Sequence, residues 1–382
     1  MVSLFMDVSS ETVHGLLPVF LVTVLGASFT AVGVLEGFAE GTALAFKVVS
    51  GPLSDWMRRR KPLALIGYSM GALSKPFFAL AQSVSLVYAA RIFDRIGKGI
   101  RGAPRDALIA DIAPPALRGR AYGLRQSLDT VGAFLGPILA IALMRATGDN
   151  FRAVFWIATI PGVIAVAILF LGVSETSERE DGSRRRIELE DFARFERAFW
   201  IVVCAGAMFQ LARFSEAFLI LRARGLGLSL ELAPMVLVVM NVVYSLAAYP
   251  VGYLSDKIGR EWFLLGGLGV LCFSDALLAV APGLTVTFVG IALWGLHMGL
   301  TQGILSALVA DHCDADVRGT AFGVFNLFSA IALVLASTIA GILWDKSGAL
   351  ATFATGAGLA LLSFAIYAAN FGLLGGREGT SS

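Results

Sequence analysis

The run Gly51-Pro-Leu-Ser-Asp55 recurs in the second half of the chain as Gly252-Tyr-Leu-Ser-Asp256. A second run, Arg118-Gly-Arg-Ala-Tyr-Gly123, recurs as Arg318-Gly-Thr-Ala-Phe-Gly323, 200 positions further on. Several matches at nearly one spacing indicate an internal duplication. We therefore predict a chain built from two structurally related halves.

The composition excludes a water-soluble protein. Of the 382 residues, 57% are hydrophobic and only 15% are charged, whereas about 25% are charged in an ordinary soluble domain. No soluble core could bury that much apolar surface. Disordered, collagen-like and disulfide-rich classes are excluded as well, since the chain has only three cysteines. We therefore predict a polytopic membrane protein.

Apolar segments predict twelve membrane-spanning helices. Such a helix needs about 20 mostly apolar residues to cross a hydrocarbon core of roughly 30 Å. Windows of that length lie at residues 3–25, 29–50, 62–81, 84–106, 119–145, 151–172, 198–221, 230–251, 262–281, 284–308, 319–343 and 348–372. Together with the duplication, they predict an all-α fold of two parallel six-helix bundles, at residues 1–173 and 198–382. The polar stretch 174–197 is predicted to be a cytoplasmic linker.

The distribution of Lys and Arg predicts the orientation of the chain. Loops after even-numbered spans hold more bases than the loops on the opposite face, and such bases mark the cytoplasmic side. Among them are Arg58, Arg59, Arg60, Lys61, Arg118, Arg120, Lys257, Arg260 and Arg318. We expect both termini to be cytoplasmic and the protein to reside in the cell membrane as a monomer.

The repeated loop resembles that of the major facilitator superfamily, and the resemblance extends over essentially the whole chain. In that family, the loop between spans 2 and 3 carries Gly-x-Leu-Ser/Ala-Asp-Arg/Lys-x-Gly-Arg-Arg/Lys and helps to latch the cytoplasmic side. The copy at 252–260 matches closely, whereas the copy at 51–60 has Trp56 in place of a base and Arg58 in place of a glycine. The resemblance implies a cytoplasmic gate that comprises Gly51, Asp55, Arg59, Arg60, Gly252, Asp256, Lys257 and Arg260. The alternative is a basic loop that only sets the topology.

Span 5 carries a second pattern that is similar to a family motif. Gly123, Gly132 and Gly136-Pro137 are spaced as in the motif associated with proton-coupled exporters, although Ala140-Ile141 replaces its usual final Gly-Gly. This resemblance implies export. The alternative is a packing face of small residues with a proline kink.

Ionisable side chains are concentrated within the spans of the first half. Each costs roughly 2.5–3.5 kcal/mol on insertion scales, so each is a functional hypothesis. On span 1, Asp7, Glu11 and His14 share one helical face because they are spaced by four and three residues. The others include Glu36, Glu40, Arg91, Asp94, Arg95, Lys98, Arg101, Arg105, Asp106, Arg125 and Asp129.

Counting residues from the span ends predicts ion pairs between spans 1, 2 and 4. Glu36 is expected at the level of Arg91 and Arg95, and Glu40 at the level of Lys98. Under one interpretation, these ions form a closed network that fixes the helices and binds nothing. Its candidate members are Glu36, Glu40, Asp94, Arg105, Asp106 and Arg125.

Under the other interpretation, surplus bases on span 4 hold an anion and a carboxylate carries a proton. Bases outnumber acids on that helix, which favours an anionic or zwitterionic substrate, and the family resemblance places spans 1 and 4 at the central cavity. Desolvation disfavours the charged form of a carboxylate, as a proton relay requires. The candidate substrate-binding residues are Arg91, Arg95, Lys98, Arg101, His14 and His297, and the candidate proton-coupling residues are Asp7, Glu11 and Asp129.

The second half has fewer ionisable residues within its spans. Arg213 and Glu216 lie one turn apart and are expected to pair with each other, and Asp275 is expected to be peripheral. His297 could face the cavity or serve as a structural residue at a helix interface. We therefore expect coupling chemistry in the first half.

These observations predict a secondary transporter that works by alternating access, with proton-coupled export of a small organic anion or an amphipathic metabolite or drug. The alternative is a divalent-metal exporter that uses Asp7, Glu11 and His14 as ligands. The sequence has no Gly-x-x-x-x-Gly-Lys-Ser/Thr run and no His-Glu-x-x-His run, so we expect no ATP hydrolysis and no enzyme activity. The expected partners are the lipid bilayer and a small-molecule substrate, with no nucleic acid, no resident metal and no cofactor beyond a proton gradient.

Overall fold

The computed structural model describes residues 1–57, 60–114, 117–173, 195, 197–311, 313 and 318–369. All the regular secondary structure in these ranges is helical, which confirms the predicted all-α class. The chain divides into two compact units, Met1–Arg184 with Leu228–Val238, and Arg185–Gly227 with Val239–Ser382. The exact domain limits set out above stay a prediction, because most of the linker lies outside the described residues.

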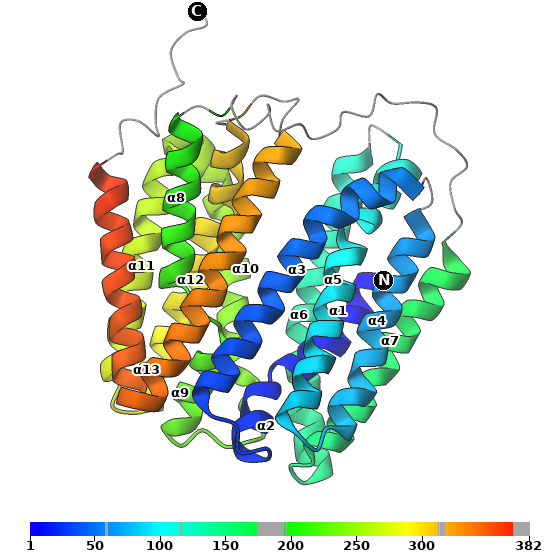
Figure 1. The fold of residues 1–382 in the computed structure, drawn as a ribbon, viewed down its shortest axis with the longest axis horizontal. Helices are drawn as coiled ribbons and strands as arrows, with labels where there is room; N and C mark the ends of the chain where they lie inside the picture. Colours follow the sequence, from blue (N-terminus) through cyan, green and yellow to red (C-terminus); the bar gives the residue numbers. More distant parts are fainter. Residues whose placement is uncertain are drawn as a thin grey trace, which may run out of the picture. The chain divides into compact units, whose positions relative to one another are not determined.

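Helices α1 to α7 belong to the first unit (Figure 1). They are α1 (Val2–His14), α2 (Leu17–Thr23), α3 (Phe29–Met57), α4 (Arg60–Leu80), α5 (Val84–Ile112), α6 (Arg118–Thr147) and α7 (Phe151–Gly172). Two of them begin at side chains that satisfy a free N–H group of the first turn. Ser83 Oγ accepts from Leu86 N at 3.4 Å, and Asn150 Oδ1 accepts from Ala153 N at 3.1 Å.

Helices α8 to α13 make up most of the second unit, although the first residues of α10 group with the first unit. They are α8 (Arg197–Ala212), α9 (Ala217–Gly225), α10 (Met235–Ile258), α11 (Arg260–Val280), α12 (Leu284–Asp311) and α13 (Arg318–Ala369). The long α13 contains a non-helical residue, Gly348, with φ +79° and ψ −179°. Such a φ is readily adopted only by glycine, so α13 is interrupted here by a kink between two helical segments.

The helices correspond to the twelve predicted spans. Spans 1 and 7 are each split, into α1 with α2 and α8 with α9, and α13 covers spans 11 and 12. Eight described helical segments are long and apolar enough to cross a membrane, and one of them, Thr320–Ala369, is long enough to cross twice. The predicted spans outside this set either break in the middle or carry several ionisable side chains.

Span 1 breaks after His14 for a local reason. Pro18 has no N–H group, and its ring clashes with the carbonyl group four residues earlier, which belongs to His14. Helix α1 therefore ends at His14, and α2 begins at Leu17. The break places the imidazole of His14 at a helix end within the first unit.

In the first unit, α1 and α5, which carry most of the candidate charged residues, pack against different helices. Helix α1 packs mainly against α6 and α7, and α5 packs mainly against α3 and α4. An apolar cluster that includes Met6, Tyr68, Ala72 and Leu169 joins α1, α4 and α7. In the second unit, α11 packs against α12 and α13, and α13 packs against α8.

Candidate functional site

Two ion pairs connect α3 with α5 in the first unit. Arg91 Nη2 donates to Glu36 Oε2 at 2.8 Å, and both side chains are almost fully buried, with 2% and 1% exposed. Arg95 Nη1 lies 2.9 Å from Glu40 Oε1. The predicted pairing of Glu36 with the Arg91 level is confirmed. The prediction for Glu40 is wrong by about one helical turn, because Glu40 pairs with Arg95 rather than with Lys98.

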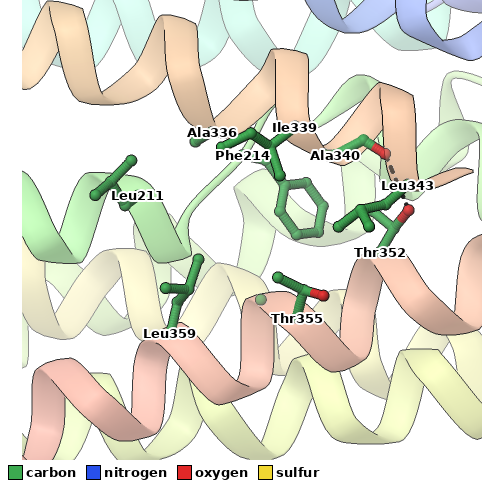
Figure 2. A pocket seen from close by; sticks show the side chains of 10 residues that line it. Leu211, Phe214, Ala336, Ile339, Ala340, Leu343, Thr352, Thr355 and Leu359 are labelled. Carbon is green, nitrogen blue, oxygen red and sulfur yellow. Dashed lines mark hydrogen bonds between the residues drawn. The ribbon is translucent and has the colours of Figure 1, made fainter.

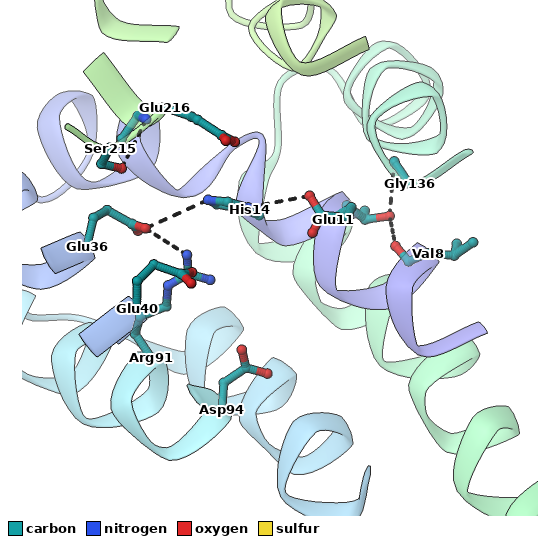
Figure 3. Close-up of polar contacts among 12 residues, drawn as sticks. Val8, Glu11, His14, Glu36, Glu40, Arg91, Asp94, Gly136, Ser215 and Glu216 are labelled. Carbon is teal, nitrogen blue, oxygen red and sulfur yellow. Dashed lines mark hydrogen bonds and ion pairs between the residues drawn. The ribbon is translucent and has the colours of Figure 1, made fainter. Parts of the chain in front are cut away.

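His14 links α1 to this pair of helices (Figure 3). Its Nδ1 lies 3.4 Å from Glu11 Oε2 on the same helix, and its Nε2 lies 3.7 Å from Glu36 Oε2 on α3. Glu36 therefore faces both His14 and Arg91. His14, which we considered for substrate binding, belongs to the charge network in this conformation.

Asp94 is held by a base that sequence reasoning missed. Lys75 Nζ on α4 donates to Asp94 Oδ1 at 2.7 Å, and Ser74 Oγ donates to the same oxygen at 3.1 Å. Asp94 Oδ2 lies 3.6 Å from Arg95 Nε, so the carboxylate connects Lys75 with Arg95. The signal was present, because Lys75 is a single base in the middle of an otherwise uncharged span.

Three charged candidate residues in the spans of the first half have no ion-pair partner among the described residues: Lys98, Arg101 and Asp7. Lys98 is exposed, whereas Arg101 is buried. The guanidinium of Arg101 lies 4.8 Å from the ring centroid of Tyr68, and its Nη1 has no hydrogen-bond partner in the described part of the chain. Both bases lie within electrostatic range of Asp7. The ion pairs with Glu36 and Glu40 therefore use Arg91 and Arg95, and they leave Lys98, Arg101 and Asp7 available to bind a substrate or a proton.

A second charge network joins α5 to α6. Asp106 Oδ1 accepts from Arg105 Nε at 3.0 Å and from Arg125 Nη1 at 3.3 Å. Arg125 and Arg105 also lie 3.4 Å and 3.8 Å from Asp129 Oδ2. Asp129 is thus engaged with two bases, unlike Asp7.

The glycine pattern on α6 lies directly against α1, at the positions of Asp7 and Glu11. A methyl group added to Gly132 would come within 2.9 Å of Asp7 Cβ, and one added to Gly136 within 2.6 Å of Glu11 Cβ. Thr12 Oγ1 donates to the Gly136 carbonyl at 3.1 Å. Pro137 follows inside the same helix. The two glycines therefore allow close approach of the backbones where the candidate coupling residues lie.

The predicted gate is only partly described. Arg60 and Arg260 begin α4 and α11. Lys257 Nζ on α10 donates to Tyr253 Oη at 2.6 Å, one turn earlier, and Gly252 is exposed. Arg59 and the side-chain environments at Gly51, Asp55 and Asp256 lie outside the described residues. The gate stays a prediction.

The break in span 7 carries a polar cluster within the second unit. Arg213 Nη2 lies 3.4 Å from Glu216 Oε1, which confirms the predicted pair. With its amide oxygen turned toward Arg213, Gln302 accepts from both terminal guanidinium nitrogens at 3.0 Å, and its amide nitrogen donates to Tyr244 Oη at 3.2 Å.

His297 lies on α12 in the aromatic interior of the second unit. Its ring centroid is 5.6 Å from that of Phe209 and 5.6 Å from that of Trp294. The imidazole is fully buried, and neither nitrogen has a hydrogen-bond partner in the described ranges. This environment favours the structural interpretation of His297 over substrate contact.

The second unit also has an apolar crevice beside Phe214 (Figure 2). It is lined by Leu211, Phe214, Ala336, Ile339, Ala340, Leu343, Thr352, Thr355, Gly356 and Leu359. Thr352 Oγ1 donates to the Ala340 carbonyl at 3.0 Å, so this hydroxyl is already satisfied. None of the candidate charged residues lines the crevice.

The comparisons with known proteins decide the family. Two overlapping stretches, residues 1–243 and 202–378, match the family model of the Major Facilitator Superfamily. The chain belongs to the major facilitator superfamily. An uncharacterised MFS-type transporter of Methanocaldococcus jannaschii is 31% identical to it over 366 residues, which are 94% of this chain and 90% of that protein. This superfamily member is therefore a multi-pass membrane transport protein and not an enzyme.

Two further similarities concern a resistance protein and the fold. Multidrug resistance protein MdtH of Photorhabdus laumondii is 25% identical to this transporter over 342 residues, 88% of this chain and 84% of that protein. A crystal structure of a bacterial homologue of the human lysosomal transporter Spinster has a TM-score of 0.77 at 17% identity, covering 99% of this chain and 97% of that one. The second similarity concerns the fold alone.

The alternative of a metal site has no support in the described residues. Asp7, Glu11 and His14 share one helical face, but no group of three or more His, Cys, Asp or Glu side chains within the described ranges is placed to hold a metal ion. Glu11 and His14 are instead paired with each other.

Proposed function

We propose that this transporter exports a small organic anion or an amphipathic anionic molecule across the cell membrane, coupled to protons. The two halves would alternate in exposing a central site to either side. The observation that carries the proposal is the ion pairing in the first unit, which leaves Lys98 and Arg101 without carboxylate partners among the described residues. A base in a membrane needs an anion to offset the cost of desolvation, and a transported anion can supply it.

Asp7 is the proposed proton carrier. Glu11 is held by His14 and Asp129 by two arginines, whereas Asp7 has no ion-pair partner in the described part of the chain. A carboxylate without a fixed partner can alternate between its two protonation states without breaking a structural ion pair. The proximity of Lys98 and Arg101 would couple that change to anion binding.

The outward direction is supported by two resemblances. Multidrug resistance protein MdtH and the class C tetracycline resistance protein of Escherichia coli, which is 27% identical over 331 residues, are both named for resistance. The Gly132 and Gly136-Pro137 pattern resembles the motif of proton-coupled exporters. We further propose cytoplasmic termini, from the basic loops, and a monomer that needs no cofactor besides the proton gradient.

Anion binding to the purified protein tests the proposal. A ligand at about 100 times its dissociation constant should stabilise the folded protein by roughly 2.7 kcal/mol. We would screen benzoate, succinate and taurocholate by thermal shift in wild type, Lys98→Gln, Arg101→Gln and the control Lys346→Gln. A charged hydrogen bond contributes about 1.5–3 kcal/mol, so each site variant should weaken binding by roughly 10- to 150-fold, whereas Lys346→Gln should not.

Unchanged anion affinity in both site variants would refute the proposed site. Circular dichroism spectra and melting temperatures without ligand separate this result from misfolding. Lys98→Gln is the more informative variant, because Lys98 is exposed, whereas Arg101 is buried.

A further inference from the structure

Asp275 on α11 is a fully buried carboxylate without a described partner. Its side chain is 0% exposed, and neither oxygen has a hydrogen-bond partner among the described residues. A methyl group added to Gly356 on α13 would come within 2.6 Å of Asp275 Oδ2 and 2.8 Å of Phe214 Cε1. The carboxylate therefore lies against a helix backbone and beside an aromatic ring. The expectation that Asp275 is peripheral is wrong.

The internal duplication shows what is unusual about this position. The spacing of 200 residues that relates Arg118 to Arg318 also relates Lys75 to Asp275 and Asp94 to Trp294. In the first unit, Lys75 and Asp94 form a buried ion pair of 2.7 Å between α4 and α5. In the second unit, the sign of the charge is reversed at Asp275, and the position of its partner is occupied by an uncharged indole.

The serine beside each charge has changed its partner too. Ser74 donates to Asp94 in the first unit, whereas Ser274 donates to the Gly290 carbonyl at 2.8 Å. The Nε1 atom of Trp294 is buried and has no hydrogen-bond partner among the described residues. The second unit therefore has a charged residue, Asp275, at the position of Lys75, but no residue of opposite charge at the position of Asp94.

The titratable groups around Asp275 do not supply a cation. Cys272 lies one turn before Asp275 on α11. His297 lies on α12, one turn after Trp294, and Tyr367 lies on α13. Both α12 and α13 pack against α11. Neither oxygen of Asp275 accepts a hydrogen bond from any of these groups, or from a Lys or Arg side chain in the described part of the chain.

Arg222 of α9 and Arg213 in the preceding break are engaged elsewhere. Arg213 faces Glu216 and Gln302, and Arg222 donates to the carbonyls of Leu278, Ala279 and Ala281. An ionised carboxylate in such a place would bear the full cost of desolvation.

We propose that Asp275 binds a proton and is carried as the neutral acid, which makes it a proton-binding site of the second unit. The site is distinct from Asp7 and does not depend on the proposed anion transport. Phe214 and Gly356, which lie beside the carboxylate, also line the apolar crevice of Figure 2, and no side chain of this lining, its two threonines included, hydrogen-bonds to Asp275. The second half of this transporter thus holds a proton of its own.

Infrared spectroscopy of the purified protein tests the protonation state directly. We would subtract the spectrum of Asp275→Asn from that of the wild type at pH 7. The difference should contain the carbonyl stretching band of a protonated carboxylic acid, and the carboxylate stretching bands should be missing from it. Carboxylate bands in the difference would overturn the proposal, because they would show an ionised Asp275.

Melting temperatures provide the second measurement, with the duplicated position as a matched control. Asp275→Asn and Asp275→Leu should melt within about 3 °C of the wild type, because both replace a neutral group that has no described hydrogen bond. Asp94→Asn leaves Lys75 buried without its counter-ion and should melt lower by roughly 5 °C or more. Losses at Asp275→Asn and Asp275→Leu as large as that of Asp94→Asn, or failure of both to fold, would overturn the proposal.

Discussion

Arg91 Nη2 and Glu36 Oε2 lie 2.8 Å apart, and both side chains are buried within the first unit of the transporter. His14 Nε2 approaches the same carboxylate oxygen at 3.7 Å. One acid on α3 therefore faces a base from α5 and an imidazole from α1. This contact makes the three helices dependent on one another, because the loss of either charge would leave the other uncompensated.

The Glu36–Arg91 pair should show strong coupling in a double-mutant cycle. Glu36→Gln or Arg91→Gln alone should destabilise the protein by about 3–5 kcal/mol, since each leaves a buried charge without its partner. The double variant should recover most of that loss. Chemical unfolding in detergent measures the three free energies, and additive losses would show that the pair is not coupled.

Close packing of α6 on α1 predicts opposite effects for two glycines of one helix. Gly136→Ala places a methyl group 2.6 Å from Glu11 Cβ and should destabilise the protein by about 1–3 kcal/mol. Gly123→Ala meets no atom within 4 Å and should be neutral or stabilise the helix by up to about 1 kcal/mol. Melting temperatures check both. Equal changes in melting temperature for the two variants would contradict the close approach of α6 to α1 at Gly136.

Asp7 and Glu11 should respond differently to neutralisation although they lie one turn apart. Asp7→Asn should leave the melting temperature nearly unchanged but abolish transport driven by a pH gradient in proteoliposomes. Glu11→Gln should lower the stability by about 1–3 kcal/mol, because it removes the 3.4 Å contact with His14.

Counterflow exchange, which needs no net proton movement, provides the control for Asp7→Asn. It should persist in this variant if Asp7 carries the coupled proton. Gradient-driven transport at the wild-type rate in Asp7→Asn would rule out this role.

Arg222 and Arg152 hold equivalent helix ends with different strength. Arg222 donates to the carbonyls of Leu278, Ala279 and Ala281, at 2.9, 3.2 and 3.1 Å, whereas Arg152 donates to that of Ala81 at 2.9 Å. Both groups cap the free carbonyls at the end of a helix.

Substitution of these two arginines should follow the number of carbonyls they cap. Arg222→Met should therefore cost roughly 2–3 kcal/mol of stability, and Arg152→Met about 1 kcal/mol. Hydrogen exchange at the ends of α11 and α4 can locate each effect. Equal losses in the two variants would argue against the role of the extra contacts.

The family and its helices could be predicted from the sequence. Hydropathy and the 200-residue duplication can be read directly from the sequence, and they predicted the spans. Counting residues from the ends of those spans then predicted that Glu36 lies at the level of Arg91. Helical periodicity also placed Asp7, Glu11 and His14 on one face, because side chains four and three residues apart lie above one another. The breaks in spans 1 and 7 were not anticipated, although Pro18 was a signal for the first.

Only the tertiary structure decided which charges are neutralised. The rotation and depth of each helix are set by its neighbours, and an error of one turn shifts a side chain by about 5.4 Å, more than the length of an ion pair. Glu40 therefore faces Arg95 instead of Lys98, and Lys75 proves to be the partner of Asp94. The sequence by itself determined that this is a two-fold duplicated transporter with charge in its membrane spans. The packing of helices decided which charged residues remain without an ion pair. An ion pair depends on the distance between side chains of different helices, and the sequence alone does not specify that distance.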